Sequence, residues 1–232
     1  MSSLKVYIVN TLDESFAQNR EALAHSLSPY RTAKLERLAA SRAQDNLSRR
    51  RADNYELCLA AGLVTDIGLS AYGLREKDMK YGTAANGKPV FLNHPEIHFN
   101  ISHAGHFAVA AFSDDYELGI DIESSLRISN RIIYSFFSEG ERELILACPD
   151  DYSRRLMFGR IWTMHEAFVK STGLGMAVPR NSYEAVTKDG RLAIRQDLCE
   201  GEFGAYEMNP IEDYCVSVVA ARNINIESQA RG

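Results

Sequence analysis

The stretch "GIDIE" (residues 119–123) alternates apolar and acidic side chains within an otherwise apolar neighbourhood. In a β-strand successive side chains point to opposite faces, so Ile120 and Ile122 share one face. Asp121 and Glu123 then share the other, roughly 7 Å apart at about 3.3 Å rise per residue. Like charges at this spacing repel, and burying them unpaired is costly, so the pattern calls for a positive partner.

One candidate partner is a hard cation. Magnesium is typically held by one or two carboxylates together with phosphate oxygens and water. Asp121 and Glu123 are of the right type and share a face. An edge strand whose polar face meets water also explains such a pair, and for an isolated pair it is the commoner explanation.

Composition limits the classes of protein to consider. The 232 residues suffice for one large domain or two small ones. A net charge of −5 argues against general binding of nucleic acid or anionic membrane, which needs a basic surface. No apolar stretch approaches membrane-spanning length, and the first residues lack the pattern of a cleavable signal. The cysteines are scattered without a C-x-x-C pair, which favours reduced thiols in a cytoplasmic protein.

Hydrophobic periodicity predicts a series of strands and helices. Strands are expected at residues 4–9, 96–102, 107–113 and 117–123, and residues 86–91 are expected to form a turn leading into a short strand. Helices are expected at 19–61 (broken near 28–29 and 41), 138–147 and 153–172, and four more strands in "SYEAV", "RLAI", "GAYEM" and "DYCVSVVAA". This order predicts an α+β fold of two similar halves, residues 1–113 and 114–232, although no sequence repeat is visible.

The segment "EIHFNISHAGHF" (residues 96–107) alternates cleanly before a turn. One face carries Ile97, Phe99 and Ile101, and the other carries His98, Asn100 and Ser102. His103 is expected at the turn, where it is either a surface residue or a group for phosphate contact or proton transfer. The histidines at positions 94, 98, 103 and 106 raise a zinc hypothesis, which their spacing does not favour.

The helix containing "WTMHEAFVKSTGLG" (residues 162–175) has apolar residues on two sides. Such a helix is usually buried on both, so Glu166 and Lys170 would need partners there, such as a metal and a phosphate. An i,i+4 ion pair on a solvated face is the alternative. Gly173 is expected to end the helix.

Two further charged groups have ordinary explanations beside functional ones. In "FFSEGERELI", Ser138 and Glu141 fit a capping box, which is favoured over a catalytic role for Glu141. The N-terminal helices carry basic residues that form either solvated faces or a phosphate-binding cluster. These are Arg31, Lys34, Arg37, Arg49, Arg50 and Arg51.

Three pieces stand in one order: "GKPVF" leading to "FNISH", then "GIDIE", then "WTMHEAFVKSTGLG". Together they resemble the motifs of the 4′-phosphopantetheinyl transferases of the longer, surfactin-type (Sfp-like) class. Each motif is weak alone, but the set in this order over residues 86–176 is specific. The resemblance implies an intramolecular pseudo-dimer of two α+β halves with the active site in the cleft between them.

The resemblance also implies an activity. Such enzymes move the phosphopantetheine arm of coenzyme A to a serine of an apo carrier protein of the acyl, peptidyl or polyketide type. They release adenosine 3′,5′-bisphosphate and require Mg²⁺. The first half would hold the adenine and 3′-phosphate, and the second the metal and the catalytic helix, in a protein expected to be monomeric.

Site residues follow from the motif positions. Asp121, Glu123 and Glu166 resemble the metal-binding acids, and Glu166 also the base. Lys170 resembles the lysine on the pyrophosphate, and His103 a phosphate-contacting histidine. The remaining coenzyme A contacts implied are Arg31, Lys34, Arg50 and Lys88.

One position departs from the family pattern, because His165 stands where the family usually has lysine. Histidine is mostly uncharged at neutral pH, so a positive charge near the phosphates is expected to be missing, and His165→Lys to raise turnover. Two other functions stay open: a coenzyme A- or carrier-binding protein without transfer activity, and a Mg²⁺-dependent hydrolase of a nucleotide pyrophosphate.

Overall fold

The computed structural model describes residues 3–44, 48–84, 87–125, 128–175, 178–179, 182–198, 201–209, 211–221 and 225–230. The first part of the chain forms β1 (Ser3–Asn10), α1 (Glu14–Ala24), α2 (Pro29–Gln44), α3 (Ser48–Ser70), the 3₁₀ turn η1 (Glu76–Asp78), β2 (Tyr81–Thr83), β3 (Pro89–Phe91), β4 (His98–Ala104) and β5 (Phe107–Ser113). The rest forms β6 (Leu118–Ser124), α4 (Asn130–Phe136), α5 (Glu139–Leu146), α6 (Asp151–Thr172), β7 (Tyr183–Lys188), β8 (Arg191–Gln196), β9 (Phe203–Met208), β10 (Tyr214–Ala221) and β11 (Asn225–Ala230). The mixed α and β content confirms the predicted class.

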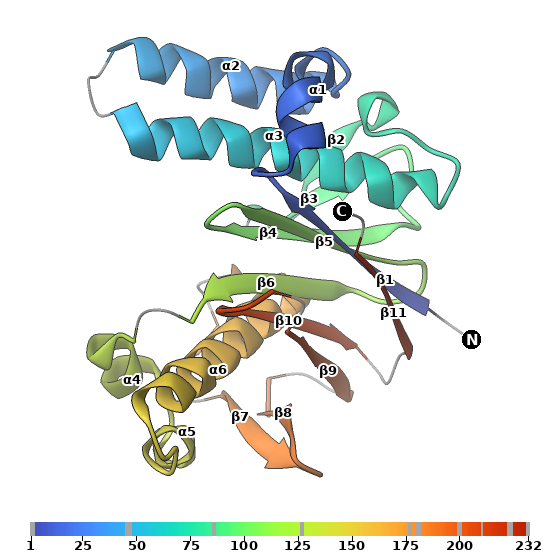
Figure 1. Ribbon diagram of the computed structural model, residues 1–232. Coiled ribbons are helices and arrows are strands. Elements are labelled where there is room, and N and C mark those ends of the chain that lie inside the picture. Colours follow the sequence, from blue (N-terminus) through green and yellow to red (C-terminus); the bar gives the residue numbers. More distant parts are fainter. Residues whose placement is uncertain are drawn as a thin grey trace.

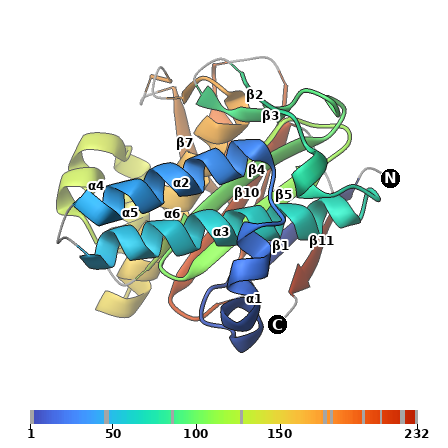
Figure 2. The same cartoon turned by 90° about the horizontal axis from the view of Figure 1, so that it is seen from above.

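The elements stack in four layers (Figure 1). Helices α1 to α3 cover a sheet with strand order β11-β1-β5-β4. A second sheet, of order β6-β10-β9, lies under the first, and α6 packs on its far side. Seen from above, α2 and α3 lie side by side over the sheets (Figure 2).

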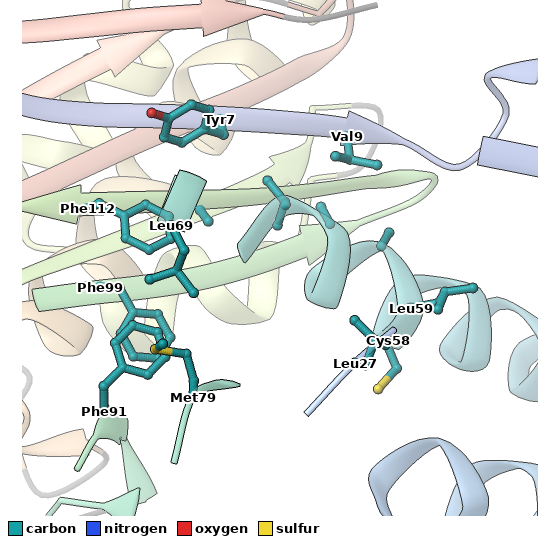
Figure 3. Close-up of a cluster of buried hydrophobic side chains, with 14 of the residues drawn as sticks. Tyr7, Val9, Leu27, Cys58, Leu59, Leu69, Met79, Phe91, Phe99 and Phe112 are labelled. Atoms are coloured by element: carbon teal, nitrogen blue, oxygen red, sulfur yellow. The ribbon is translucent and has the colours of Figure 1, made fainter. Parts of the chain in front are cut away.

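Three hydrophobic cores separate these layers. The first joins α3 to the upper sheet, with Phe99, Phe112 and Leu69 close together (Figure 3). The second lies between the sheets and includes Ile120 and Ile122, and the third joins α6 to the second sheet. The isoleucines of β6 share one face, as the sequence predicts, and the structure shows that this face packs against the first sheet.

Strand β6 approaches α6 unusually closely at Gly119. A Cβ added there would lie 2.0 Å from the carbonyl oxygen of Ala167 and 2.6 Å from the amide nitrogen of Ser171. Both are backbone atoms, so neither can rotate away. Only glycine allows this packing, and the face of β6 that carries Asp121 and Glu123 is thereby held against α6.

Side chains join β4 to β6 where the two sheets meet. Asn100 on β4 accepts a hydrogen bond from the Ile120 amide at 3.0 Å. Lys88 donates to the Leu118 carbonyl at 3.0 Å and pairs with Glu117 at 2.5 Å. His98 contacts the other oxygen of Glu117 at 3.0 Å.

The structure differs from the sequence prediction in several elements. Helix α4 and strand β11 were not predicted, and β11 pairs in parallel with β1 from the other end of the chain. Helix α3 continues past residue 61 to Ser70. Its glycines do not end the helix: a Cβ at Gly62 or Gly68 would clash with Leu27 or Phe112, so they allow close packing of the helix. Helix α2 runs to Gln44 without the break predicted near residue 41, and α3 begins at Ser48.

Across the described residues, the helices are all too short or too polar to span a membrane.

Substituting Gly119 by alanine is expected to lower the free energy of unfolding by about 3 kcal/mol, the upper end of overpacking costs, because the clashing atoms are backbone. Urea denaturation measures this. Gly140→Ala is the matched control, since a Cβ there meets only Ser138 Oγ at 4.0 Å in an exposed helical turn. Equal stability of the two variants would show that α6 does not depend on Gly119.

Glu117 makes the stability of the contact between the two sheets depend on pH. Its bonds to His98 and then to Lys88 lower its pKa to about 2. Because this lies below the unfolded-state value of about 4.3, its contribution to stability is complete above that pH and is lost as the pH falls toward 2. Glu117→Gln should therefore cost at most about 1 kcal/mol at pH 7, since the carboxylate is half exposed.

The measurement is thermal unfolding of wild type and Glu117→Gln between pH 7 and pH 2.5. The two curves should converge as the pH falls through about 4. A constant difference across this range would mean that the Glu117 carboxylate does not stabilise the fold through its charge.

Candidate active site

Helix α6 carries two of the predicted site residues into the interior. It begins at a capping box between Asp150 and Ser153 and ends at Gly173, whose φ of 65° is left-handed. Phe158 and Phe168 are buried on the face toward β7 to β9, as their spacing predicts. Glu166 and Lys170, on other faces of the same turns, are partly buried rather than solvated.

Lys170 joins α6 to both sheets. Its ammonium donates to Asp121 Oδ1 at 2.6 Å, to Ser102 Oγ at 3.1 Å and to the Ile120 carbonyl at 3.1 Å. Ser102 in turn donates to Asp121 Oδ1 at 2.7 Å. The predicted lysine and the predicted acid are therefore in direct contact, which corrects the simpler i,i+4 pairing of Lys170 with Glu166.

The three predicted acids form one electrostatic group. Burial raises the pKa of Glu166, and the charge of Asp121 raises it further. Burial also raises the pKa of Glu123, again with a contribution from Asp121, against a bond from the Ser124 amide. Lys170 acts in the opposite direction on both. The like charges are thus close enough to repel, and the positive charge of Lys170 partly offsets this repulsion.

A basic flank continues from this group toward α2. His103 lies within β4, opposite Ala108, rather than in the turn as predicted, because the turn is confined to Gly105 and His106. Reduced hydration is the main cause that lowers the pKa of His103, and the charge of Lys34 is the second. Lys34 is exposed on α2, so the first layer of helices places a cation near His103.

Arg31 lies one helical turn before Lys34 but points into the protein. It is 4% exposed, with its Nε 3.7 Å from Oε1 of the fully buried Glu76. Its guanidinium carbon lies 5.9 Å and 5.8 Å from the ring centroids of Tyr30 and Tyr81. The sequence did not indicate this pairing, because Glu76 is distant in sequence and sits in a polar segment.

The other predicted coenzyme A contacts are placed differently. Lys88 is held by Glu117 and the Leu118 carbonyl, at the opposite end of β6 from Glu123. The side chain of Arg50, near the start of α3, lies outside the described part of the chain.

Glu141 and His165 form a buried pair. His165 Nε2 lies 2.5 Å from Glu141 Oε1, which also accepts from the Ala185 amide at 2.6 Å. Glu141 Oε2 accepts from the Ser138 amide at 2.8 Å and completes the predicted capping box. His165 is 3% exposed. The sequence predicted that the residue at position 165 affects the charge near the phosphates. The structure corrects this, because the His165 side chain packs between α6, α5 and β7 instead.

The sequence pattern predicted that Ser102 and Asn100 share a face of their strand, but it did not predict what they contact. Both side chains point from β4 to β6, one to Asp121 and the other to the Ile120 amide. The alternation in "EIHFNIS" was the available signal. Of the proposed zinc set, His94 contacts Glu96 and His98 contacts Glu117.

Comparisons with known proteins show the family of this chain. A family model described as the 4′-phosphopantetheinyl transferase superfamily matches residues 117–219, which include β6 and α6. The chain is 33% identical over 175 residues to 4′-phosphopantetheinyl transferase ffp of Bacillus subtilis, covering 73% of this chain and 75% of that protein. It is 34% identical over 172 residues to 4′-phosphopantetheinyl transferase Sfp of Bacillus subtilis (strain 168), with the same coverage.

A solved structure, the holo-[acyl-carrier-protein] synthase of Thermotoga maritima, is similar over 45% of this chain and 62% of that one, with 19% identity and a TM-score of 0.40. The two Bacillus relatives, by contrast, match at more than 30% identity over three quarters of their own length. This chain belongs to the surfactin-type (Sfp-like) class of the 4′-phosphopantetheinyl transferase family and is an enzyme of that type.

Proposed function

We propose that the protein transfers the 4′-phosphopantetheine arm of coenzyme A to a serine of an apo acyl, peptidyl or polyketide carrier protein, releasing adenosine 3′,5′-bisphosphate. Family membership supports the transfer and coenzyme A as its substrate. The observation that carries the rest is the ion pair of Lys170 with Asp121, together with the electrostatic influence of both residues on Glu123 and Glu166.

We propose that the substrate lies across the boundary between two α+β halves, residues 1–113 and 114–232, which are related as a pseudo-dimer. Lys34 and His103 come from the first, and the acids and Lys170 from the second. Because one chain supplies both sides of the site, we propose that the protein is a monomer. We also propose that it acts in the cytoplasm.

Magnesium fits the donor set in kind, since three carboxylates on a strand and a facing helix are hard oxygen ligands. Within the described residues, no group of three His, Cys, Asp or Glu side chains is already arranged around a metal position. Lys170 occupies Asp121 Oδ1 instead. We propose Asp121, Glu123 and Glu166 as the residues that would hold the ion; when bound, it would neutralise pyrophosphate charge.

The reaction itself needs little covalent chemistry from this chain. The carrier serine oxygen forms a bond to the β-phosphorus of coenzyme A while the bond to the bridging oxygen breaks, and adenosine 3′,5′-bisphosphate leaves. Glu166 accepts the serine proton, a task that its raised pKa favours. Catalysis then rests on positioning and charge neutralisation.

Basic residues hold the rest of coenzyme A. Lys170 is the proposed contact on the pyrophosphate, and His103 and Lys34 are proposed phosphate contacts, which their mutual electrostatic influence near the end of β4 supports. Lys88 and Arg50 are proposed contacts on the adenine and 3′-phosphate side. Arg31 belongs to the same group, although Glu76 already neutralises its charge.

The test is the intact mass of apo carrier proteins incubated with this protein, coenzyme A and Mg²⁺. A gain of one phosphopantetheine is expected, together with adenosine 3′,5′-bisphosphate. Glu166→Ala should lower the rate by about 10²–10⁴-fold, the usual contribution of a general base. Removal of metal by a chelator should abolish transfer.

Glu21→Ala is the matched control, because Glu21 is an exposed acid in the middle of α1. It should transfer at the wild-type rate. Coenzyme A bound but never transferred to any carrier class would favour a binding protein, and coenzyme A cleaved without labelling would favour a hydrolase.

The buried pair predicts a stability effect at position 165. His165→Ala leaves Glu141 without its side-chain partner and should lower the free energy of unfolding by about 3 kcal/mol, typical of a broken buried pair. Urea denaturation measures this loss. Turnover per folded molecule should change little, so a large fall in turnover without loss of stability would return His165 to the phosphate site.

A further inference from the structure

The ammonium group of Lys170 is already fully used inside the protein. It has three N–H donors, and the structure gives it three acceptors on Asp121, Ser102 and Ile120. The shortest of these bonds, 2.6 Å, goes to the carboxylate. A phosphate oxygen therefore meets no spare donor on Lys170 in this arrangement.

Ser102 closes the contact into a ring. Its hydroxyl accepts from Lys170 and donates to the same Asp121 oxygen, and a hydroxyl can do both at once. The residue is 8% exposed, so water competes poorly for these bonds. The ring ties β4, β6 and α6 together, one residue from each.

Lys170 also supplies a positive charge that offsets the repulsion among the three carboxylates. The charge of Asp121 disfavours ionisation of Glu123 and Glu166, and the charge of Lys170 favours it. In this state the lysine therefore stabilises the three carboxylates as a bound cation would.

We propose that Lys170 holds the place of the cation at Asp121 in the substrate-free protein, and that metal binding releases it. Ser102 is then the positioning residue that keeps Lys170 in place until that exchange. The inference rests on the proposed function, because it concerns the same metal site. One carboxylate oxygen cannot hold an ammonium and a metal ion together without bringing two positive charges into contact. The flexible stem of lysine allows Lys170 to turn to a phosphate oxygen.

The direct test follows the lysine Nζ signals of ¹⁵N-labelled protein by NMR while Mg²⁺ is added without coenzyme A. The signal assigned to Lys170 should shift and exchange faster with water as its three bonds break. Lys88 is the internal control, because it makes a comparable carboxylate pair and carbonyl bond at Glu117 and Leu118. A Lys170 signal as constant as that of Lys88, with metal bound, would overturn the proposal: the ion would then use other oxygens.

A second measurement is the Mg²⁺ dissociation constant by calorimetry, again without coenzyme A. Ser102→Ala should bind the ion about tenfold more tightly, since a hydrogen bond to a charged group contributes about that factor. Ser113→Ala is the control, because Ser113 is also a buried serine and its hydroxyl accepts from the Asp115 and Tyr116 amides in the turn after β5. Unchanged or weaker binding by Ser102→Ala, or no binding by either protein, contradicts the proposal.

Both measurements omit coenzyme A and the carrier, so their failure is distinct from failure of the transferase assay. A protein that never modifies a carrier, but releases Lys170 on metal binding, would disprove the proposed function alone. A working transferase whose Lys170 stays on Asp121 would disprove the exchange alone.

Discussion

The contact between β6 and α6 at Gly119 is the constraint on which the site depends. With a Cβ placed 2.0 Å from the Ala167 carbonyl, any other residue would push the helix away. The turn of α6 from Glu166 to Lys170 would then move away from Asp121, with which Lys170 now makes a 2.6 Å bond. Backbone-to-backbone packing thus sets the distance between a strand bearing two acids and a helix bearing a third.

That closeness has an energetic cost, which the neighbouring residues offset. Burial and mutual repulsion disfavour the charged forms of Glu123 and Glu166. A carboxylate group of this kind destabilises the folded protein until a cation joins it. Lys170 reduces this cost from α6, because its positive charge favours the ionised forms of Glu123 and Glu166.

The sequence predicted the features that local alternation encodes. Period two in "GIDIE" and "EIHFNIS" placed each side chain on its face, and helical spacing in residues 158–170 predicted a buried helix. What it missed depends on distant partners. The pairing of Arg31 with Glu76, of Lys88 with Glu117 and of β11 with β1 joins segments that no local pattern connects. Helix α4 was missed because it is only a few residues long.

Position 165 shows why adjacency in sequence misleads near a site. Consecutive residues of an α-helix point about 100° apart, so His165 and Glu166 face different neighbours. Glu166 faces β6 and its acids, whereas His165 faces Glu141 in the core beyond. Both oxygens of Glu141 are in turn occupied by His165, Ala185 and Ser138. A carboxylate so engaged is held for structure rather than presented to a substrate, which is consistent with the proposal that Glu166 is the base.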